Sequence, residues 1–334
     1  MSPSSSTPRD ATEAIDTPGE RLSELGEFGL ISRVTRDRPQ PPATLLGPGD
    51  DAAVVASPDG RVVACTDVLV DCVHFRLDWS TPEQVGRKAA AANLADIAAM
   101  GAVPTGLLVG LACPADTPVE TLEDLAAGLW AEAGVVGVGV VGGDVASSAT
   151  LVVSVTALGS LEGRAPVLRT GARPGDVVAV AGRLGWSGAG LAVLTRGFRS
   201  PGTVVNAHRV PEPPYAAGPA AAKAGATSMI DVSDGLLADL GHIARVSGVL
   251  VDLRSEALEV PARLVDVGSA LGVDPLHWLL TGGEDHALVA TFPPDTALPE
   301  GWREIGVAAA GEPVVLVDGR TYEGDQGWDH FAGR

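Results

Sequence analysis

Residues 82–100 read PEQVGRKAAAANLADIAAM and form the segment on which the fold prediction depends. Thr81 can cap a helix with its hydroxyl, the proline after it suits the first helical position, and Gly101 can end the helix. The segment is so rich in alanine that this helix has to be buried on most sides. A buried carboxylate without a partner is costly, so Asp96 needs a cation or strong hydrogen-bond donors. An ion pair with Lys88 is the structural alternative.

Short strands and helices alternate on both sides of this helix, which is the pattern of an α/β protein with mixed α+β layers. Before it, one apolar face predicts a short helix over residues 22–34, and Pro and Gly in residues 57–60 suggest a hairpin turn. After it, apolar runs predict further strands and one more helix. The predicted elements of this half are strands at 53–56, 61–66, 107–111, 135–141 and 151–158 and a helix at 119–133.

A chain of 334 residues is long enough for two domains of ordinary size. Residues 162–174 contain Gly, Pro and Arg without apolar periodicity, so we place the domain boundary there. A second α/β unit follows, with strands expected at 177–181, 227–230, 287–292 and 314–317 and a helix running to about residue 246. The predicted organisation is a disordered tail at 1–20, an N-terminal domain at 21–165 and a C-terminal domain at 166–334.

The composition excludes several classes of function. A formal net charge of −19 leaves no basic surface for nucleic acid or an anionic membrane, so neither is an expected partner. The longest uncharged run, residues 97–115, is broken by Gly and Pro and cannot be one spanning helix. Cys65, Cys72 and Cys113 form no C-x-x-C pair and leave an odd count, which disfavours a disulfide scaffold and a zinc site. A reducing, cytoplasmic location is expected.

Aspartates follow three of the apolar runs. Predicted strands are expected to stop at Asp67, Asp144 and Asp231, and ligands of open α/β sheets gather outside the carboxyl ends of strands. Carboxylates brought together repel one another unless hard cations lie between them, so the pattern predicts a Mg²⁺ site. In the Asp50-Asp51 pair, strand alternation lets only one side chain face such a site, and we choose Asp51. The structural alternatives are turn roles for Asp50 and Asp51 and helix-capping roles for Asp144 and Asp234.

Three glycine-rich segments, residues 142–144, 182–188 and 282–285, can bring backbone N–H groups close to phosphate oxygens. None of them matches the P-loop pattern, and the chain has no H-R-D or D-F-G set of a protein kinase. No histidine or cysteine lies in a recognised nucleophile motif, so hydrolase triads are disfavoured. Each segment alone is also consistent with a tight turn.

Several motifs, in order and spacing, together carry a resemblance to one family. They are LGEFGLI (25–31), GPGDDA (47–52), TDVL (66–69), HF (74–75), ANLADIAAMG (92–101), GGD (142–144), IDVSDGL (230–236), GGED (282–285) and GWDHF (327–331). Over residues 25–331 the chain resembles the thiamine-monophosphate kinase family. The resemblance implies the two-domain fold of aminoimidazole ribonucleotide synthetase, a homodimer joined through the N-terminal domains, and ATP bound in a cleft.

The resemblance also implies roles for individual residues. The family's magnesium positions correspond to Asp51, Thr66, Asp67, Asp96, Asp144, Asp231 and Asp234, of which we take Asp67, Asp96 and Asp231 as catalytic. The positions that contact ATP correspond to Gly143, Asp144, Arg169 and Ser233, and those that contact the thiamine phosphate to His74, Glu284 and Trp328. Two residues depart from the family pattern. Cys65 replaces the usual Ser or Thr, and His286 stands where Tyr is frequent.

The implied reaction is transfer of the ATP γ-phosphoryl group to thiamine monophosphate, which gives thiamine diphosphate and ADP. Mg²⁺ ions held by the aspartates are expected to screen the repulsion between two anionic substrates. The alternatives are another enzyme of the superfamily, such as aminoimidazole ribonucleotide synthetase, and a metal- or nucleotide-binding regulatory protein without turnover. A selenophosphate synthetase is disfavoured because no reactive Cys lies in an N-terminal Gly-rich loop. A hydrogenase-maturation protein is disfavoured because the chain does not end in Cys.

Overall fold

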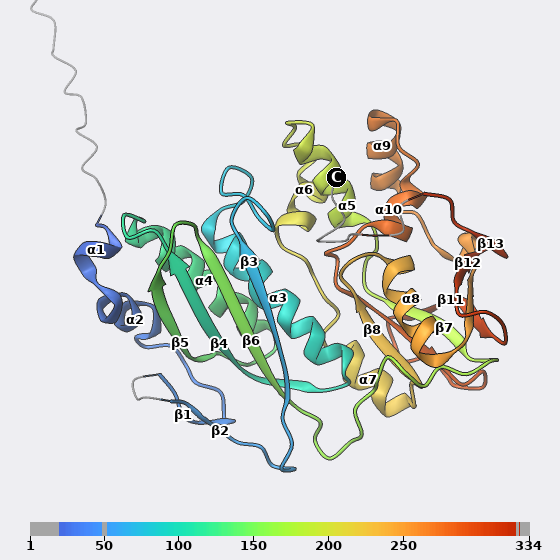
Figure 1. The fold of residues 1–334 in the computed structure, drawn as a ribbon, viewed down its shortest axis with the longest axis horizontal. Helices are drawn as coiled ribbons and strands as arrows, with labels where there is room; N and C mark the ends of the chain where they lie inside the picture. Colours follow the sequence, from blue (N-terminus) through green and yellow to red (C-terminus); the bar gives the residue numbers. More distant parts are fainter. Residues whose placement is uncertain (1–19, 49–51, 325–326, 328–334) are drawn as a thin grey trace, which may run out of the picture.

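Two main β-sheets and the helices packed on them form the part of the chain that the computed structural model describes, residues 20–48, 52–324 and 327 (Figure 1). The N-terminal half comprises α1 (Leu22–Leu25), α2 (Glu27–Thr35), β1 (Thr44–Leu46), β2 (Val54–Val55), β3 (Val63–Val70), α3 (Pro82–Ala99), β4 (Val103–Cys113), α4 (Val119–Val135), β5 (Val140–Ser147) and β6 (Val152–Ser160). The C-terminal half comprises β7 (Val177–Ala181), α5 (Trp186–Thr195), α6 (Gly202–Arg209), α7 (Ala217–Ala224), β8 (Ser228–Val232), α8 (Leu236–Ser247), β9 (Leu250–Leu253), a 3₁₀ helix (Ser255–Ala257), α9 (Ala262–Leu271), α10 (Pro275–Thr281), β10 (Ala287–Phe292), β11 (Trp302–Ala309), β12 (Val315–Val317) and β13 (Arg320–Thr321).

The four-stranded N-terminal sheet has the order β3-β6-β4-β5, and only the β4–β5 pair is parallel. Helices α3 and α4 cover one of its faces. The seven-stranded C-terminal sheet has the order β13-β12-β9-β11-β7-β10-β8. Helices α5, α8, α9 and α10 pack on one of its faces, and α3 and α7 on the other. The chain thus has the predicted mixed α/β architecture.

Helix α3 lies between the two sheets, as its alanine-rich sequence predicts (Figure 1). The Thr81 hydroxyl accepts a hydrogen bond from the Gln84 backbone N–H at 3.3 Å, and the Gln84 side chain accepts one from the Thr81 N–H at 3.0 Å. Gly101 follows the helix with a φ of +70°, which favours glycine. The helix is therefore bounded where the sequence predicts, and it brings Asp96 to the junction of the domains.

Helices α3 and α4 cross at a distance that only glycine permits. A Cβ atom added at Gly86 of α3 would lie 2.0 Å from the Leu125 carbonyl oxygen. One added at Gly128 of α4 would lie 1.9 Å from the Glu83 carbonyl oxygen. Because both contacts are with backbone, the helices would have to move apart to accept a methyl group.

Gly128→Ala is therefore expected to lower the free energy of unfolding by about 1–3 kcal/mol. Gly134, in the same helix, is the matched control, because a Cβ there meets nothing within 4 Å. Gly134→Ala is expected to raise the free energy of unfolding by up to about 1 kcal/mol through helix propensity. Urea denaturation followed by circular dichroism measures both changes, and equal effects would show that the close crossing is not what makes Gly128 necessary.

Several predicted elements differ from the structure. The helix predicted at 22–34 is broken by Gly26, whose φ is +76°. The hairpin is wrong, because β2 pairs with β1 and not with β3. Strands β3, β5 and β8 run past Asp67, Asp144 and Asp231, so these residues lie inside strands and do not follow them. The segment predicted as the loop 142–144 is likewise part of β5.

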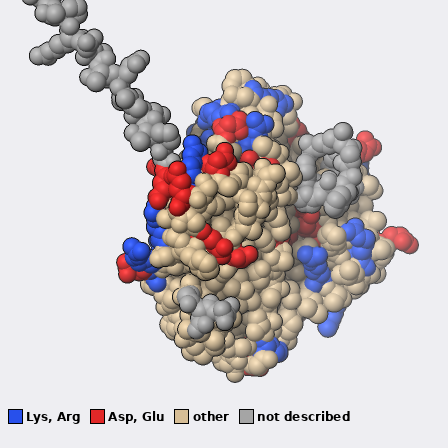
Figure 2. Space-filling view, turned by 60° about the vertical axis from the view of Figure 1, so that its left-hand side comes forward, with Lys and Arg blue, Asp and Glu red and all other residues tan. Residues whose placement is uncertain are grey.

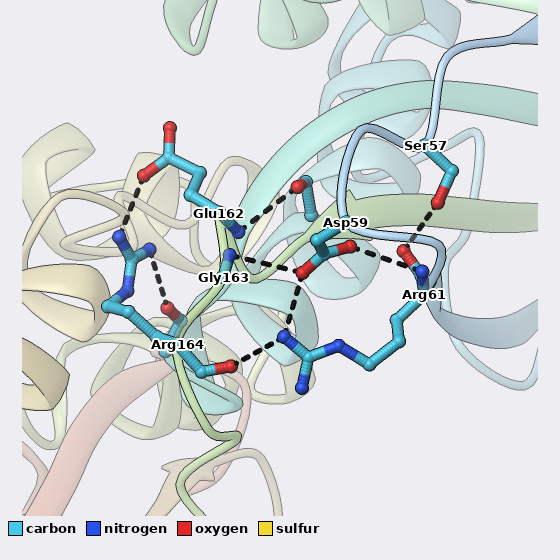
Figure 3. A network of polar contacts seen from close by, with 8 residues as sticks. Ser57, Asp59, Arg61, Glu162, Gly163 and Arg164 are labelled. Carbon is cyan, nitrogen blue, oxygen red and sulfur yellow. Dashed lines mark hydrogen bonds and ion pairs between the residues drawn. The ribbon is translucent and has the colours of Figure 1, made fainter.

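The connection between the two halves is tied to the N-terminal half by a polar network (Figure 3). Asp59 accepts hydrogen bonds from the Gly163 N–H at 3.1 Å and from the Arg61 guanidinium at 2.8 Å. Arg61 also donates to the Arg164 carbonyl oxygen at 3.0 Å, and the Arg164 guanidinium donates to Glu162 at 2.8 Å. The start of the predicted boundary segment is therefore held in place. Residues 1–19 of the predicted tail lie outside the described residues.

Candidate active site

A cavity of about 720 Å³ lies where α3 meets the C-terminal sheet and its loops. It is lined by residues from β3 and the loop after it, from α3 and α5, and from the segments that precede α8 and β10. Seven of the residues predicted for the site line this cavity: Asp67, His74, Asp96, Asp231, Ser233, Asp234 and Glu284. Residues from both halves of the chain therefore meet here.

Three aspartates from three elements form the acidic end of the cavity. Asp67 comes from β3, Asp96 from α3 and Asp231 from β8. Burial, together with the negative charges of Asp231 and Asp67, raises the pKa of Asp96 to about 7. Burial and Asp231 also raise the pKa of Asp67. Close carboxylates with raised pKa values are typical of sites that receive a cation.

His286, one of the two departures from the family pattern, contacts this group. Its Nδ1 lies 3.0 Å from Asp231 Oδ2, and both side chains are buried. Burial opposes protonation of His286, but the hydrogen bond and the charge of Asp231 raise its pKa. The other departure, Cys65, lies beside the same carboxylates, and burial raises the pKa of its thiol. Cys65 is therefore a neutral thiol here and not a thiolate ligand.

Two buried polar residues that the sequence analysis did not single out fix the backbone around the aspartates. Asn93 accepts a hydrogen bond from the Asp67 N–H at 3.1 Å and donates to the Ala89 carbonyl oxygen at 3.0 Å. Asp239 accepts hydrogen bonds from the backbone N–H groups of Ser233, Asp234 and Gly235 at 3.0–3.1 Å. A polar residue in an otherwise apolar helical segment is the sequence signal that could have revealed both.

The carboxylate side chains of the cavity fit a Mg²⁺ ion that is bound together with a nucleotide. Within residues 20–48, 52–324 and 327, no group of three or more His, Cys, Asp or Glu side chains is arranged to hold a metal ion without further ligands. Mg²⁺ usually takes one or two carboxylates and completes its coordination with water and substrate phosphates. The carboxylate oxygens of Asp67, Asp96 and Asp231 suit such an ion, and burial and mutual repulsion raise the pKa values of Asp67 and Asp96 although His286 lies nearby.

Glu284 lines the same cavity. Lys88 does not pair with Asp96, the structural alternative considered for it, but with Glu284, at 2.7 Å. Burial would raise the pKa of Glu284, but the positive charge of Lys88 and the proximity of His208 lower it to about 2. His74, which also lines the cavity, accepts a hydrogen bond on Nδ1 from the Val70 N–H at 3.0 Å.

Four predicted site residues are not brought to this cavity. Thr66 lies on the face of β3 opposite to Asp67, where its hydroxyl donates to the Val155 carbonyl oxygen at 3.0 Å. Gly143 and Asp144 are exposed on β5 and line a separate cavity beside α2. Arg169 is exposed in the connection between the halves. The remaining two, Asp51 and Trp328, lie outside the described residues.

Comparison with known proteins places this arrangement in a family. Residues 49–161 match the family model of the N-terminal domain of AIR synthase related proteins, and residues 173–313 match that of the C-terminal domain. The chain is 53% identical over 326 residues to thiamine-monophosphate kinase of Mycobacterium tuberculosis, and the alignment covers 97% of each chain. The chain belongs to the thiamine-monophosphate kinase family. The family member of Corynebacterium glutamicum is 42% identical, with 94% of this chain and 96% of that protein covered.

Solved structures agree with this membership of the thiamine-monophosphate kinase family. The structure of AaThiL complexed with AMPPCP and TMP superposes with a TM-score of 0.77 at 34% identity, over 94% of this chain and 100% of that one. The two-domain fold implied by the family resemblance is thereby confirmed. No helix in the described part of the chain has the length and apolarity needed to span a membrane.

Proposed function

We propose that this protein transfers the γ-phosphoryl group of ATP to thiamine monophosphate and releases thiamine diphosphate and ADP. The family membership supports this assignment, because relatives aligned over nearly the whole chain are thiamine-monophosphate kinases. The observation that carries it is the cavity at the domain junction, where four aspartates from both halves face the same space as Glu284. The reaction makes a new P–O bond and breaks the bond between the γ-phosphorus and the β–γ bridging oxygen.

The acceptor needs little activation by the protein. A phosphate monoester is mostly dianionic at neutral pH because its second pKa is about 6. Its oxygen can therefore attack without a general base, and positioning of the two substrates supplies most of the catalysis. The side chains of the cavity then serve mainly to orient the two substrates and to hold the cations that screen their charges.

We assign the Mg²⁺ positions to Asp67, Asp96, Asp231 and Asp234 in this cavity, together with Asp51, Thr66 and Asp144 from the family resemblance. Bound there, Mg²⁺ supplies positive charge that offsets the phosphate oxygens. Gly143, Asp144, Arg169 and Ser233 are proposed to contact ATP, and His74, Glu284 and Trp328 to contact the thiamine phosphate. Asp67, Asp96 and Asp231 are the proposed catalytic carboxylates.

We further propose a homodimer joined through the N-terminal domains. The side of the molecule that carries α1 and α2 has a broad area with few charged side chains (Figure 2). Val68 and Leu108, on strands of the N-terminal sheet, are 47% and 36% exposed. Burying such a surface against a second copy is favourable. The free thiols of Cys65, Cys72 and Cys113 support a reducing, cytoplasmic location.

Incubation of the protein with thiamine monophosphate, ATP and MgCl₂ tests the proposed reaction. We expect thiamine diphosphate and ADP in equal amounts, measured by chromatography. Unphosphorylated thiamine serves as the acceptor control and is expected to give neither diphosphate nor monophosphate. ATP binding without formation of thiamine diphosphate at high enzyme concentration would contradict the assignment and favour a regulatory nucleotide-binding protein.

A further inference from the structure

Glu284 is held on both carboxylate oxygens by buried side chains that come from different parts of the fold. Its own side chain is 34% exposed and lines the cavity. Its backbone φ is +64°, a region that non-glycine residues occupy at a cost and that clusters at functional sites. The carboxylate is therefore fixed by its surroundings and open to the cavity on one side.

Lys88 contacts the first oxygen. It is one of two lysines in the chain, the other being Lys223 on the surface of α7. Only 6% of the Lys88 side chain is exposed, and its Nζ lies 2.7 Å from Glu284 Oε1. The same Nζ donates to the carbonyl oxygen of His74 at 3.3 Å. Lys88 thus joins the loop after β3, in the N-terminal half, to the loop before β10, in the C-terminal half.

His208 contacts the second oxygen. Its Nδ1 lies 3.3 Å from Glu284 Oε2 and 3.0 Å from the hydroxyl of Ser187, and only 8% of its side chain is exposed. Burial and the positive charge of Lys88 lower the pKa of His208 to about 4. The imidazole is therefore neutral at pH 7, so the net charge of the Lys88–Glu284–His208 group is close to zero.

We propose that Lys88, with support from His208, is a positioning residue that fixes the ionised carboxylate of Glu284 and the His74 loop for recognition of the acceptor. This inference rests on the proposed function, in which the acceptor is a phosphate monoester with a cationic heteroaromatic group. Lys88 offsets the charge of Glu284 as a whole, but the exposed part of the carboxylate still turns negative oxygen atoms to the cavity, and these suit that positive group. Lys88 Nζ contacts Glu284 and the carbonyl oxygen of His74, both of which are assigned to the acceptor, so we expect the effect of Lys88 to fall on the acceptor more than on ATP.

Lys88→Met in the full-length protein tests the proposal by steady-state kinetics with each substrate varied in turn. Without Lys88 the Glu284 carboxylate and the His74 loop lose the contact that fixes them, so we expect KM for thiamine monophosphate to rise on the order of a hundredfold. KM for ATP is expected to change less than about threefold, because the acidic end of the cavity is intact. Lys223→Met is the matched control, since it removes the exposed lysine, and is expected to behave as the wild type.

The double variant Lys88→Met/Glu284→Gln distinguishes a role of Lys88 in positioning Glu284 from a general contribution of Lys88 to protein stability. If Lys88 acts through Glu284, the KM of the double variant for thiamine monophosphate is no higher than the higher of the two values measured for Lys88→Met alone and Glu284→Gln alone. The proposal would be overturned if the effects of the two substitutions on this KM multiplied, or if KM rose by the same factor for thiamine monophosphate and for ATP. Should Lys88→Met not fold, His208→Gln serves in its place, with an expected rise in the same KM on the order of tenfold.

The controls also separate this inference from the proposed function. If the wild type and Lys223→Met form thiamine diphosphate but Lys88→Met has an unchanged KM for thiamine monophosphate, the positioning role is wrong and the function stands. If the wild type forms no thiamine diphosphate, the proposed function itself is wrong, and this inference falls with it.

Discussion

Asp67→Asn is expected to lower kcat on the order of a thousandfold, which corresponds to about 4 kcal/mol of lost transition-state stabilisation. The substitution removes a negative charge and keeps the volume of the side chain. Asp67 lies with Asp96 and Asp231 at the acidic end of the cavity. Its loss therefore weakens the proposed Mg²⁺ site while leaving the contacts of Glu284 with Lys88 and His208 in place. Steady-state assays of thiamine diphosphate formation measure the effect.

The same variant should fold at least as well as the wild type when Mg²⁺ is absent. Burial and the charge of Asp231 raise the pKa of Asp67, so the ionised form is unfavourable in the empty cavity. Asp67→Asn removes this unfavourable charge, and the melting temperature without Mg²⁺ is expected to stay equal or rise. Asp266→Asn, an exposed carboxylate on α9, is the control and should change neither property. A variant of Asp67 that keeps most of its activity would show that the catalytic centre lies elsewhere.

The helix that carries Asp96 was predictable because the residues that determine its start, its end and its burial lie close together in the sequence. Its Thr81 cap, its alanine content and Gly101 all lie within about twenty residues, the range over which helix signals act. A carboxylate in so apolar a helix indicates a site without knowledge of the rest of the fold. The segment 230–236 was equally informative, because Asp231 lies in the buried strand β8 and Asp234 lies between that strand and helix α8.

The positions of Thr66 and Asp67 were not predictable in the same way. Strand β3 pairs along its whole length with β6, and this register joins Thr66 to Thr156 and Asp67 to Val155. Alternation along the strand then places the two side chains on opposite faces of the sheet. A single sequence contains the alternation but not the pairing, so it cannot assign a face to either residue.

The partner of Lys88 was missed for a related reason. Lys88 and Asp96 are eight residues apart on one helix, about 12 Å along its axis, which is beyond the range of local side-chain pairs. The actual partner, Glu284, lies in the other half of the chain and reaches Lys88 only when the two domains meet. Contacts between domains depend on the packing of α3 against the C-terminal sheet, for which the sequence has no local signal.

Removal of divalent cations is expected to abolish formation of thiamine diphosphate. Excess EDTA should reduce the rate below detection, and addition of MgCl₂ beyond the chelator should restore it. Four aspartates line the cavity, and the phosphates of ATP and the acceptor would add further negative charge. Without a cation these charges repel one another, so neither binding nor transfer is favourable.

Thermal unfolding distinguishes a metal needed for binding from one needed only for the chemical step. At about a hundred times its dissociation constant, Mg-ATP should stabilise the protein by about 2.7 kcal/mol, which raises the melting temperature by several degrees. ATP with EDTA is expected to give little stabilisation, because the acidic end of the cavity repels free ATP. Equal shifts with and without Mg²⁺ would place the nucleotide away from Asp67, Asp96 and Asp231. Full activity in EDTA would contradict the metal site itself.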